Sequence, residues 1–374
     1  MEIYLDNSAT TRLDTRVLEK MFQFGAEYGN PSSVHKKGQI VRVHVEKMRE
    51  NIANMLGFES KNLIFTSSGS ESNNSAIRGV VKKGDHVLTS AIEHSSVLET
   101  LKVLQKDGII ELDFIPVTQG GAIDLEKVPS LIKENTRLVS VMHANNETGV
   151  IQPIFNLKKM LRYDILLHID AVQTIGKIKE NPFRIADLCT ISPHKFYGPK
   201  GIGGLVITDR VPYTKLIHGG SQERSKRAGT ENILGIVGFH AALEIVLNEP
   251  EAEKTTKLRE QFEKMVTSSI PGAKINGEGE RRLPGISNIS FEKVSNDVVL
   301  FNLDMENIYA SAGSACSSGS IDLSHVLRAM DIPSDLQKGA VRFSFGKYNN
   351  SSEVEETTQK LKHIIERLRK KCLK

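Results

Sequence analysis

Residues 165–173 read ILLHIDAVQ, an apolar run with strand character that ends at a carboxylate and a polar turn. Similar apolar runs recur along the chain, at residues 63–66, 86–90, 110–115, 138–142, 188–192 and 204–208. Helical patterns separate these runs, and strands that alternate with amphipathic helices indicate βαβ units. We therefore expect an α/β fold, with a large domain in which helices flank a mostly parallel sheet.

The pattern changes after Asn232. A long helical stretch runs from there to about Ile270, and Pro271 and Gly272 interrupt it. Residues 286–291 form a further strand candidate, and a basic helical segment closes the chain. These features indicate a second, smaller domain of the α+β type.

The length of 374 residues suits two packed domains. We expect the large domain to span residues 15–250. The small domain is expected at residues 251–374, together with residues 1–14, and to carry a mobile loop that contains a cysteine.

Composition and charge argue against several classes of protein. Hydrophobic residues make up 39% and charged residues 25%, as in ordinary globular proteins. The net charge of +4 is small and the basic residues are dispersed, so we expect no direct binding of nucleic acid. The chain shows neither the pattern of a signal peptide nor an apolar stretch of membrane-spanning length. We expect a soluble, cytoplasmic protein that does not bind membranes.

A lysine and an aspartate follow two neighbouring strand candidates. Lys195 lies in the segment SPHKFYGPKG at residues 192–201, and Asp170 ends the apolar run described first. A desolvated lysine forms Schiff bases, and a carboxylate beside a pyridine nitrogen favours the protonated ring of pyridoxal 5′-phosphate. Gln173 is placed to reach the phenolic oxygen of that ring. The alternatives are an ordinary loop lysine and an aspartate that caps the next helix.

Two further segments fit a flat, phosphorylated cofactor. Residues 66–74 read TSSGSESNN and open a helix, whose free backbone N–H groups suit a phosphate. The segment matches neither a P-loop nor a dinucleotide-binding glycine pattern. His94 is placed to stack on a ring and to move protons, although a single histidine at a strand end is more often structural.

Several short motifs occur in one order along almost the whole chain. They include LDNSATT at residues 5–11, GNPSS at 29–33, EH at 93–94, NNETG at 145–149, HIDA at 168–171, HK at 194–195, GPKG at 198–201, RAGT at 227–230, SAGSAC at 311–316 and VRFS at 341–344. Together they resemble the cysteine desulfurases, and within that family the group that serves iron–sulfur cluster assembly. The resemblance implies the PLP-dependent transferase fold of type I.

The resemblance also implies roles for individual residues. Lys195 would carry pyridoxal 5′-phosphate, Asp170 would pair with the ring nitrogen, and His94 would act near the substrate. The remaining implied cofactor contacts are Gly69, Ser70, Asn146, Gln173, Ser192, His194 and, from the neighbouring subunit of a homodimer, Thr230. The implied substrate contacts are Asn30, Asn146 and Arg342.

Three cysteines lie far apart, which favours a reducing compartment over a disulfide framework. Cys189 lies in an apolar run and is expected to be an inert core thiol, whereas Cys372 is expected to be incidental. Cys316 lies in a segment of small residues, at 309–319, that we expect to be mobile. A thiol in such a segment suits a nucleophile that accepts sulfur and hands it on.

The implied reaction removes sulfur from L-cysteine, which yields L-alanine and a persulfide on Cys316. The sulfur would then pass to an acceptor protein, such as an iron–sulfur scaffold or a tRNA-thiolation enzyme. We expect no resident metal, although Cys316 is a candidate transient ligand of an iron–sulfur cluster. The alternatives are an enzyme of the selenocysteine lyase type, a desulfurase of the sulfur-mobilisation branch, and a catalytically inactive interaction subunit.

Overall fold

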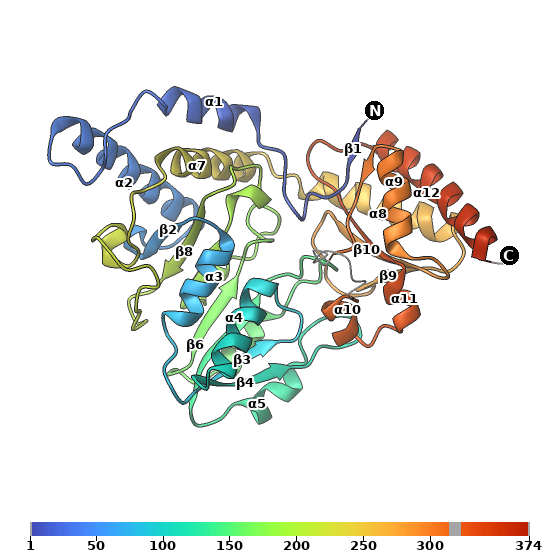
Figure 1. Cartoon of the computed structure of the whole chain (residues 1–374), viewed down its shortest axis with the longest axis horizontal. Helices are drawn as coiled ribbons and strands as arrows, with labels where there is room; N and C mark the ends of the chain where they lie inside the picture. The colour runs from blue at the N-terminus through green and yellow to red at the C-terminus, as the bar shows by residue number, and fades with distance from the viewer. Residues whose placement is uncertain (1, 314–322, 373–374) are drawn as a thin grey trace.

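The computed structural model describes residues 2–313 and 323–372, and its centre is a seven-stranded sheet (Figure 1). The strand order is β2-β8-β7-β6-β5-β3-β4. The strands are β2 (Leu63–Thr66), β3 (Asp85–Ser90), β4 (Ile110–Ile115), β5 (Thr136–Met142), β6 (Leu166–Asp170), β7 (Leu188–Ile191) and β8 (Gly203–Ile207). Strands β3 to β7 pair in parallel, whereas β8 runs antiparallel to β7 and β2. The predicted α/β fold with a mostly parallel sheet is confirmed.

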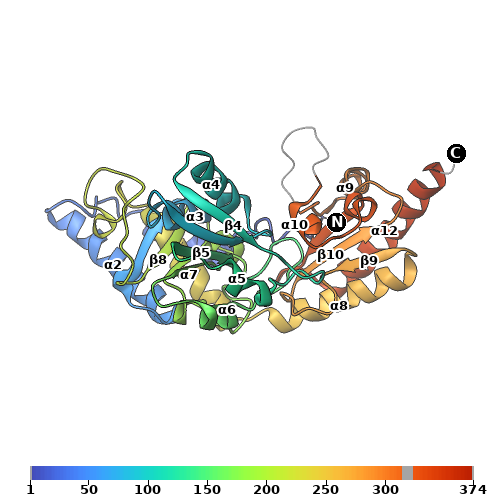
Figure 2. The ribbon, with the colours of Figure 1, turned by 90° about the horizontal axis from the view of Figure 1, so that it is seen from below.

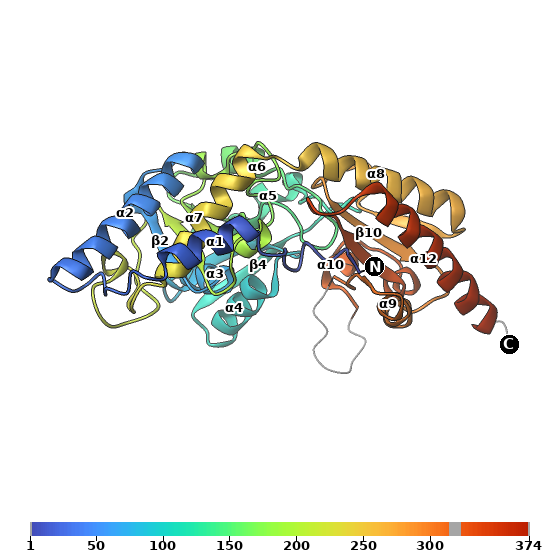
Figure 3. The same ribbon diagram turned by 90° about the horizontal axis from the view of Figure 1, so that it is seen from above.

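Alternate side chains of the strands enter apolar clusters on opposite faces of this sheet. In β6, Leu167 and Ile169 pack with helices α1, α2 and α7, whereas Leu166 packs with α3 and α4. These helices are α1 (Thr15–Phe24), α2 (Lys36–Leu56), α3 (Gly69–Arg78), α4 (Ser95–Lys106) and α7 (Ile233–Asn248). Figures 2 and 3 show α3 and α4 on one side of the sheet and α7 on the other. With both faces covered, polar side chains inside the strands need partners there, and His168 of β6 contacts Ser140 of β5 and Thr190 of β7, at 2.8 and 3.0 Å.

A smaller antiparallel sheet has the strand order β12-β10-β9. Its strands are β9 (Ala273–Asn276), β10 (Ile286–Phe291) and β12 (Ala340–Ser344), and the helices that pack near it are α8 (Ala252–Ser269), α9 (Asn296–Met305) and α12 (Ser351–Cys372). Phe262, Phe291 and Phe343 are fully buried in its core. The short helices of the chain are α5 (Val128–Leu131), α6 (Ile154–Met160), α10 (His325–Ala329) and α11 (Ser334–Lys338).

The N-terminal residues pack against the C-terminal part of the chain. Strand β1 (Ile3–Tyr4) pairs in parallel with β11 (Ile308–Tyr309), and Ile3 and Leu5 are buried in the same apolar cluster as Phe262. In Figure 1 the N-terminus accordingly lies among the orange and red elements. The division of the chain near residue 250 into two domains stays a prediction.

The single long helical stretch expected after Asn232 was wrong, because the chain forms two helices there. Helix α7 ends at Asn248 and α8 begins at Ala252, and their axes differ by 73°. Pro250 explains the break, since proline has no N–H to donate and disfavours the helical conformation of the residue before it. Among the described residues, no single helix is long and apolar enough to cross a membrane; only this bent pair passes such a test, by length and composition alone.

A buried ion pair anchors the loop that follows β8. Arg49 of α2 donates from Nη1 and Nη2 to the two carboxylate oxygens of Glu223, at 2.8 and 2.9 Å, and both side chains are 2% exposed. Glu223 also accepts from the Phe65 backbone N–H at 2.8 Å. Residues 223–225 all have positive φ angles, of 45, 57 and 61°, so this pair holds a strained turn in place.

We expect Arg49→Met to lower the free energy of unfolding by about 3–5 kcal/mol, because it leaves the Glu223 carboxylate buried without its cation. Urea unfolding followed by circular dichroism measures the change. Arg42→Met, at an exposed position of the same helix, is the matched control and should change stability by less than about 0.5 kcal/mol. The double variant Arg49→Met/Glu223→Gln should recover part of the loss. Equal unfolding midpoints for Arg49→Met and Arg42→Met would contradict this account.

Candidate active site

A cavity of about 500 Å³ lies beyond the carboxyl ends of β3, β5, β6 and β7. This is where ligands bind in open α/β sheets. Its lining includes ten of the residues predicted from the sequence, namely Gly69, Ser70, His94, Asn146, Asp170, Gln173, Ser192, His194, Lys195 and Arg342. Segments that are far apart in the chain therefore meet around one space.

Lys195 ends a short 3₁₀ turn, Pro193–Lys195, that follows β7. Its Nζ donates to the carbonyl oxygens of Ser8 and Ala9, at 2.7 and 2.6 Å. Burial, together with the nearby cations Lys177 and Arg342, lowers the pKa of Lys195 to about 7. Near neutral pH a large part of this amine is therefore unprotonated, as a nucleophilic or basic lysine requires.

Asp170 is the last residue of β6 and is 7% exposed. Its Oδ1 accepts from the Val172 N–H at 3.0 Å, and its Oδ2 accepts from Asn73 Nδ2 at 2.8 Å. The alternative that Asp170 caps the next helix was wrong, because a turn and not a helix follows β6; the carboxylate holds this turn and lines the cavity. Sequence reasoning did not find Asn73, whose pairing with Asp170 joins residues 97 positions apart.

The N-terminus of α3 forms one end of the cavity. Ser68 caps this helix by accepting from the Glu71 N–H at 3.1 Å. A Cβ on Gly69 would lie 3.1 Å from Val172 and 3.4 Å from Ser192, so the backbone approaches these residues closely. Ser192 Oγ is buried and has no hydrogen-bond partner among the described residues. A free hydroxyl beside a helix N-terminus suits an anionic group.

His194, beside this helix end, makes a 3.2 Å contact from Nδ1 to Thr10 Oγ1. Burial and the adjacent Lys195 lower the pKa of His194 to about 4, so its ring is neutral at working pH. It adds no charge of its own to this end of the cavity.

His94 is the N-cap of α4, and its Nδ1 accepts from the Ser96 N–H at 3.1 Å. Because an amide N–H only donates, Nδ1 carries no proton, and the neutral ring holds its proton on Nε2. Burial lowers the pKa of His94 and favours this neutral form. His94 is therefore both structural and able to donate a hydrogen bond from Nε2.

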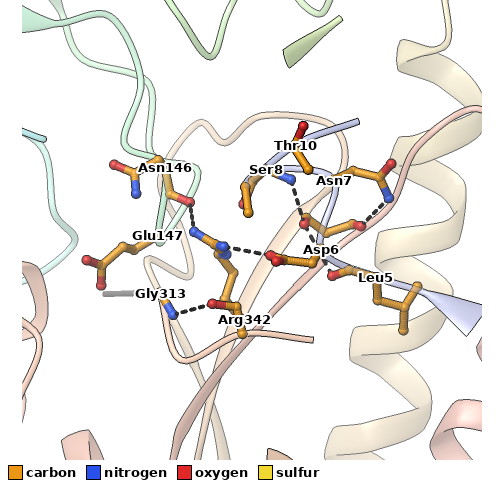
Figure 4. A network of polar contacts seen from close by, with 12 residues as sticks. Leu5, Asp6, Asn7, Ser8, Thr10, Asn146, Glu147, Gly313 and Arg342 are labelled. Atoms are coloured by element: carbon orange, nitrogen blue, oxygen red, sulfur yellow. Dashed lines mark hydrogen bonds and ion pairs between the residues drawn. The ribbon is translucent and has the colours of Figure 1, made fainter. Parts of the chain in front are cut away.

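Arg342 of β12 is 3% exposed and brings the small sheet to the cavity. Its Nη2 donates to Asp6 Oδ1 at 2.7 Å and its Nη1 to the Asn146 carbonyl at 3.0 Å (Figure 4). Its Nε is buried and has no partner in the part of the chain that the structure describes. Asp6 was missed at the sequence level, since nothing local indicates which cation it meets.

Glu147 connects the two chain segments on either side of residues 314–322. Its Oε2 accepts from Ser324 Oγ at 2.6 Å, and a Cβ on Gly313 would lie 2.9 Å from the same oxygen. Figure 4 shows Glu147 and Gly313 close together beside Arg342. Burial raises the pKa of Glu147, which favours its protonated form. No role had been predicted for this residue.

Three predicted residues are not among those that line the cavity. Asn30 and Thr230 are exposed, and the role expected of Thr230 belongs to a neighbouring subunit. Cys316 lies outside the described residues. Cys189 is 1% exposed and its pKa is raised by burial, so its prediction as an inert core thiol is confirmed.

Comparisons with known proteins agree along the whole chain. Residues 3–357 match the family model described as aminotransferase class-V. The chain is 45% identical over 377 residues to a protein named cysteine desulfurase IscS from Dictyoglomus turgidum, which covers 98% of this chain and 95% of that protein. A protein of the same name from Clostridium botulinum is 40% identical over 379 residues, with the same coverage of both.

Solved structures agree as well. One described as a NifS-like protein has a TM-score of 0.91 and 38% identity, and covers 98% of this chain and 100% of its own. Another, described as SspA in complex with cysteine, has a TM-score of 0.83 and 32% identity, and covers 94% of this chain and 100% of its own.

A buried acid near the cavity generates a pH prediction. Glu93 is 0% exposed, its Oε1 accepts from Ser90 and from the Met142 N–H, and burial raises its pKa to about 8. Because this pKa lies above that of the unfolded carboxyl, the stability it contributes is present at low pH and is lost as pH rises toward 8.

We therefore expect wild type to lose stability relative to Glu93→Gln as the pH rises from about 5 to about 8. Thermal unfolding of the cofactor-free protein at several pH values measures this difference. Glu99→Gln, at an exposed position of α4, is the control and should follow wild type. Parallel curves for wild type and Glu93→Gln would show that Glu93 ionises normally.

Proposed function

Because the chain belongs to the class-V aminotransferase family, we propose that it is a cysteine desulfurase that depends on pyridoxal 5′-phosphate. In this proposal it converts L-cysteine to L-alanine and holds the removed sulfur as a persulfide on Cys316. The observation that carries the proposal is the single cavity around the Lys195 amine, with Asp170 and Arg342 in its wall.

The residues present fit the cofactor. The amine of Lys195 would hold it covalently, and Asp170 would pair with its ring nitrogen. The unpartnered Ser192 hydroxyl and the N-terminus of α3, with Gly69 and Ser70, suit its phosphate. His194 lines the same end of the cavity, and His94, Asn146 and Gln173 line the rest. When bound, the cofactor supplies an electron sink for negative charge at the substrate α-carbon.

Lys195 is also the base that this reaction needs. An amine with a pKa of about 7 is about half unprotonated at pH 7, and this form accepts the α-proton of the substrate at Nζ. The carbonyls of Ser8 and Ala9 then accept hydrogen bonds from the ammonium that results. This arrangement lets Lys195 take up and return a proton without leaving the cavity.

Arg342 is the proposed site for the carboxylate of L-cysteine. Asp6 and the Asn146 carbonyl orient its guanidinium, and the buried Nε is left as a donor without a partner among the described residues. Asn146 lies beside it in the cavity wall. Asn30 stays a weaker proposal, since it is exposed in this single chain.

Sulfur transfer requires a thiolate, which we assign to Cys316 on the sequence alone. Its sulfur attacks the substrate sulfur, so that a sulfur–sulfur bond forms while the carbon–sulfur bond breaks with its electron pair left on carbon. The proton of the substrate thiol then completes L-alanine, and His94 is the residue proposed to exchange protons near that thiol. L-cysteine and one enzyme thiol thus become L-alanine and one enzyme persulfide, with atoms and electrons in balance.

Assembly and acceptors complete the proposal. We propose a cytoplasmic homodimer in which Thr230, on an exposed loop, contacts the phosphate in the neighbouring subunit. The persulfide sulfur would pass to an iron–sulfur scaffold or to a tRNA-thiolation enzyme. The name cysteine desulfurase IscS among the relatives supports the first of these acceptors.

Lys195→Ala should abolish alanine formation, with a loss of at least about 100-fold, because covalent attachment and proton removal both fall on one amine. Borohydride reduction of the wild type followed by peptide mass spectrometry should find the cofactor on Lys195. The control Lys200→Ala changes an exposed lysine of the same segment and should retain activity. Wild-type alanine production by Lys195→Ala would overturn the assignment.

Cys316→Ser should stop alanine formation from L-cysteine, because a hydroxyl cannot accept sulfane sulfur. Intact mass spectrometry after incubation with L-cysteine should show one added sulfur in wild type and in the control Cys372→Ser. Assays with L-selenocysteine distinguish a cysteine desulfurase from an enzyme of the selenocysteine lyase type, because the lyase releases selenium without an enzyme thiol. Alanine formation from L-cysteine at the wild-type rate by Cys316→Ser would show that another group accepts the sulfur.

A further inference from the structure

Lys177 is a half-buried lysine that the mechanism above does not use. Its Nζ donates to Gln173 Oε1 at 3.2 Å. In the part of the chain that the structure describes, no carboxylate oxygen lies within 4 Å of this amine, so Lys177 forms no ion pair there. Lys177 lines a small cavity of about 20 Å³ together with Glu251, whose carboxylate is hydrogen-bonded by Tyr197. Its amine is thus held by the Gln173 side chain and not by a carboxylate, although it is partly withdrawn from water.

The contacts with Lys177 and with the Ser8 carbonyl together fix how the Gln173 amide is turned. A side-chain amide has an acceptor end and a donor end of almost equal shape, and an ammonium can only donate. Oε1 must therefore face Lys177, and Nε2 must face the opposite way, where it donates to the Ser8 carbonyl at 2.9 Å. The second N–H of Nε2 is left for the cavity, which Gln173 lines.

The same hydrogen bonds lead to Lys195. The Ser8 carbonyl accepts from both Gln173 and Lys195, the latter at 2.7 Å, so both of its lone pairs are used. Lys177, Gln173, Ser8 and Lys195 thus form one connected chain of hydrogen bonds. A change at Lys177 reaches the reactive amine through one side chain and one carbonyl.

The charge of Lys177 acts in addition to this geometry. Lys177 and Arg342 are the cations that lower the pKa of Lys195, and Asp170 and Asp6 are the acids that oppose them. Burial lowers the pKa of Lys177 itself to about 8, and Glu251 opposes this shift. At neutral pH most Lys177 amines are still protonated, so their positive charge acts on Lys195 under working conditions.

We propose that Lys177 is a positioning residue of this site. Together with the Ser8 carbonyl it holds the Gln173 amide with its donor end toward Ser8 and the cavity, and it places a positive charge near the Lys195 amine. The cavity therefore presents the N–H of Gln173 as a donor to an anionic oxygen on a bound ring. The positive charge of Lys177 also helps to keep the Lys195 amine unprotonated and reactive. This role deepens the proposed function and rests on Lys195 as the cofactor-bearing lysine.

The first test measures the reactivity of Lys195 in the full-length, cofactor-free protein. Competitive acetylation at a series of pH values, read by peptide mass spectrometry, yields the titration midpoint of this one amine. Lys177→Met and Lys177→Gln should each raise the midpoint by about 0.5 to 1 pH unit, because they remove a nearby positive charge. Lys177→Arg should stay near wild type. Lys179→Met, at an exposed position two residues away, is the matched control and should change nothing.

The second test measures cofactor release from the holoenzyme after dilution, by loss of visible absorbance. Lys177→Met and Gln173→Leu should each speed release several-fold, and the double variant should be no faster than Gln173→Leu, since both changes act on one contact. Circular dichroism and thermal unfolding identify variants that retain the native fold, and Lys177→Gln replaces Lys177→Met if the latter does not.

An unchanged Lys195 midpoint in folded Lys177→Met and Lys177→Gln would overturn the role of the charge, and additive effects on release would overturn the role through Gln173. Failure of the proposed function looks different. In that case borohydride reduction of wild type leaves no cofactor on the Lys195 peptide, whatever the midpoints of the Lys177 variants are.

Discussion

The central sheet is covered on both faces, and this constraint determines where chemistry is possible. Alternate residues of each strand are buried beneath helices on opposite sides, so the strand interiors accept few polar groups without partners. Because β3, β5, β6 and β7 run parallel, their carboxyl ends meet along one edge. Asp170 and Lys195 are close for this reason, although 25 positions separate them in the sequence.

The N-terminal segment links that edge to the small sheet. Ile3 and Leu5 belong to the core of the small sheet, and a few positions later the carbonyls of Ser8 and Ala9 accept from Lys195. Asp6 lies between them and pairs with Arg342. One short segment therefore orients both the proposed cofactor-bearing amine and the proposed carboxylate-binding guanidinium. A shift of this segment would move the two ends of the site together.

Burial sets the charge state of the groups around the cavity. It favours the neutral forms of His94, His194 and the acids Glu93 and Glu147. It also lowers the pKa of Lys195 and Lys177. Asp170 and Arg342 line the same cavity, and Arg342 is held there by its ion pair with Asp6.

The sequence by itself determined the order of strands along the chain, the strand ends and most of the residues around the cavity. Apolar runs such as residues 165–170 indicate buried strands, and polar residues just after such runs lie at a strand end. Asn30, Thr230 and Cys316 stay predictions, because a dimer or residues outside the described chain would have to test them. The break between α7 and α8 was missed, although Pro250 was a local signal for it.

Only the tertiary structure decided which partners these residues have. The pairings of Asn73 with Asp170, Asp6 with Arg342 and Glu147 with Ser324 join distant positions. The lysine contacts with Ser8 and Ala9 use backbone carbonyls, which every residue type offers. Local patterns encode burial and backbone conformation but carry no record of which remote group fills a hydrogen-bonding position. The contact of Lys177 with Gln173 is local, but the Ser8 carbonyl that joins Gln173 to Lys195 comes from a remote segment, so the role of Lys177 becomes visible only in the folded chain.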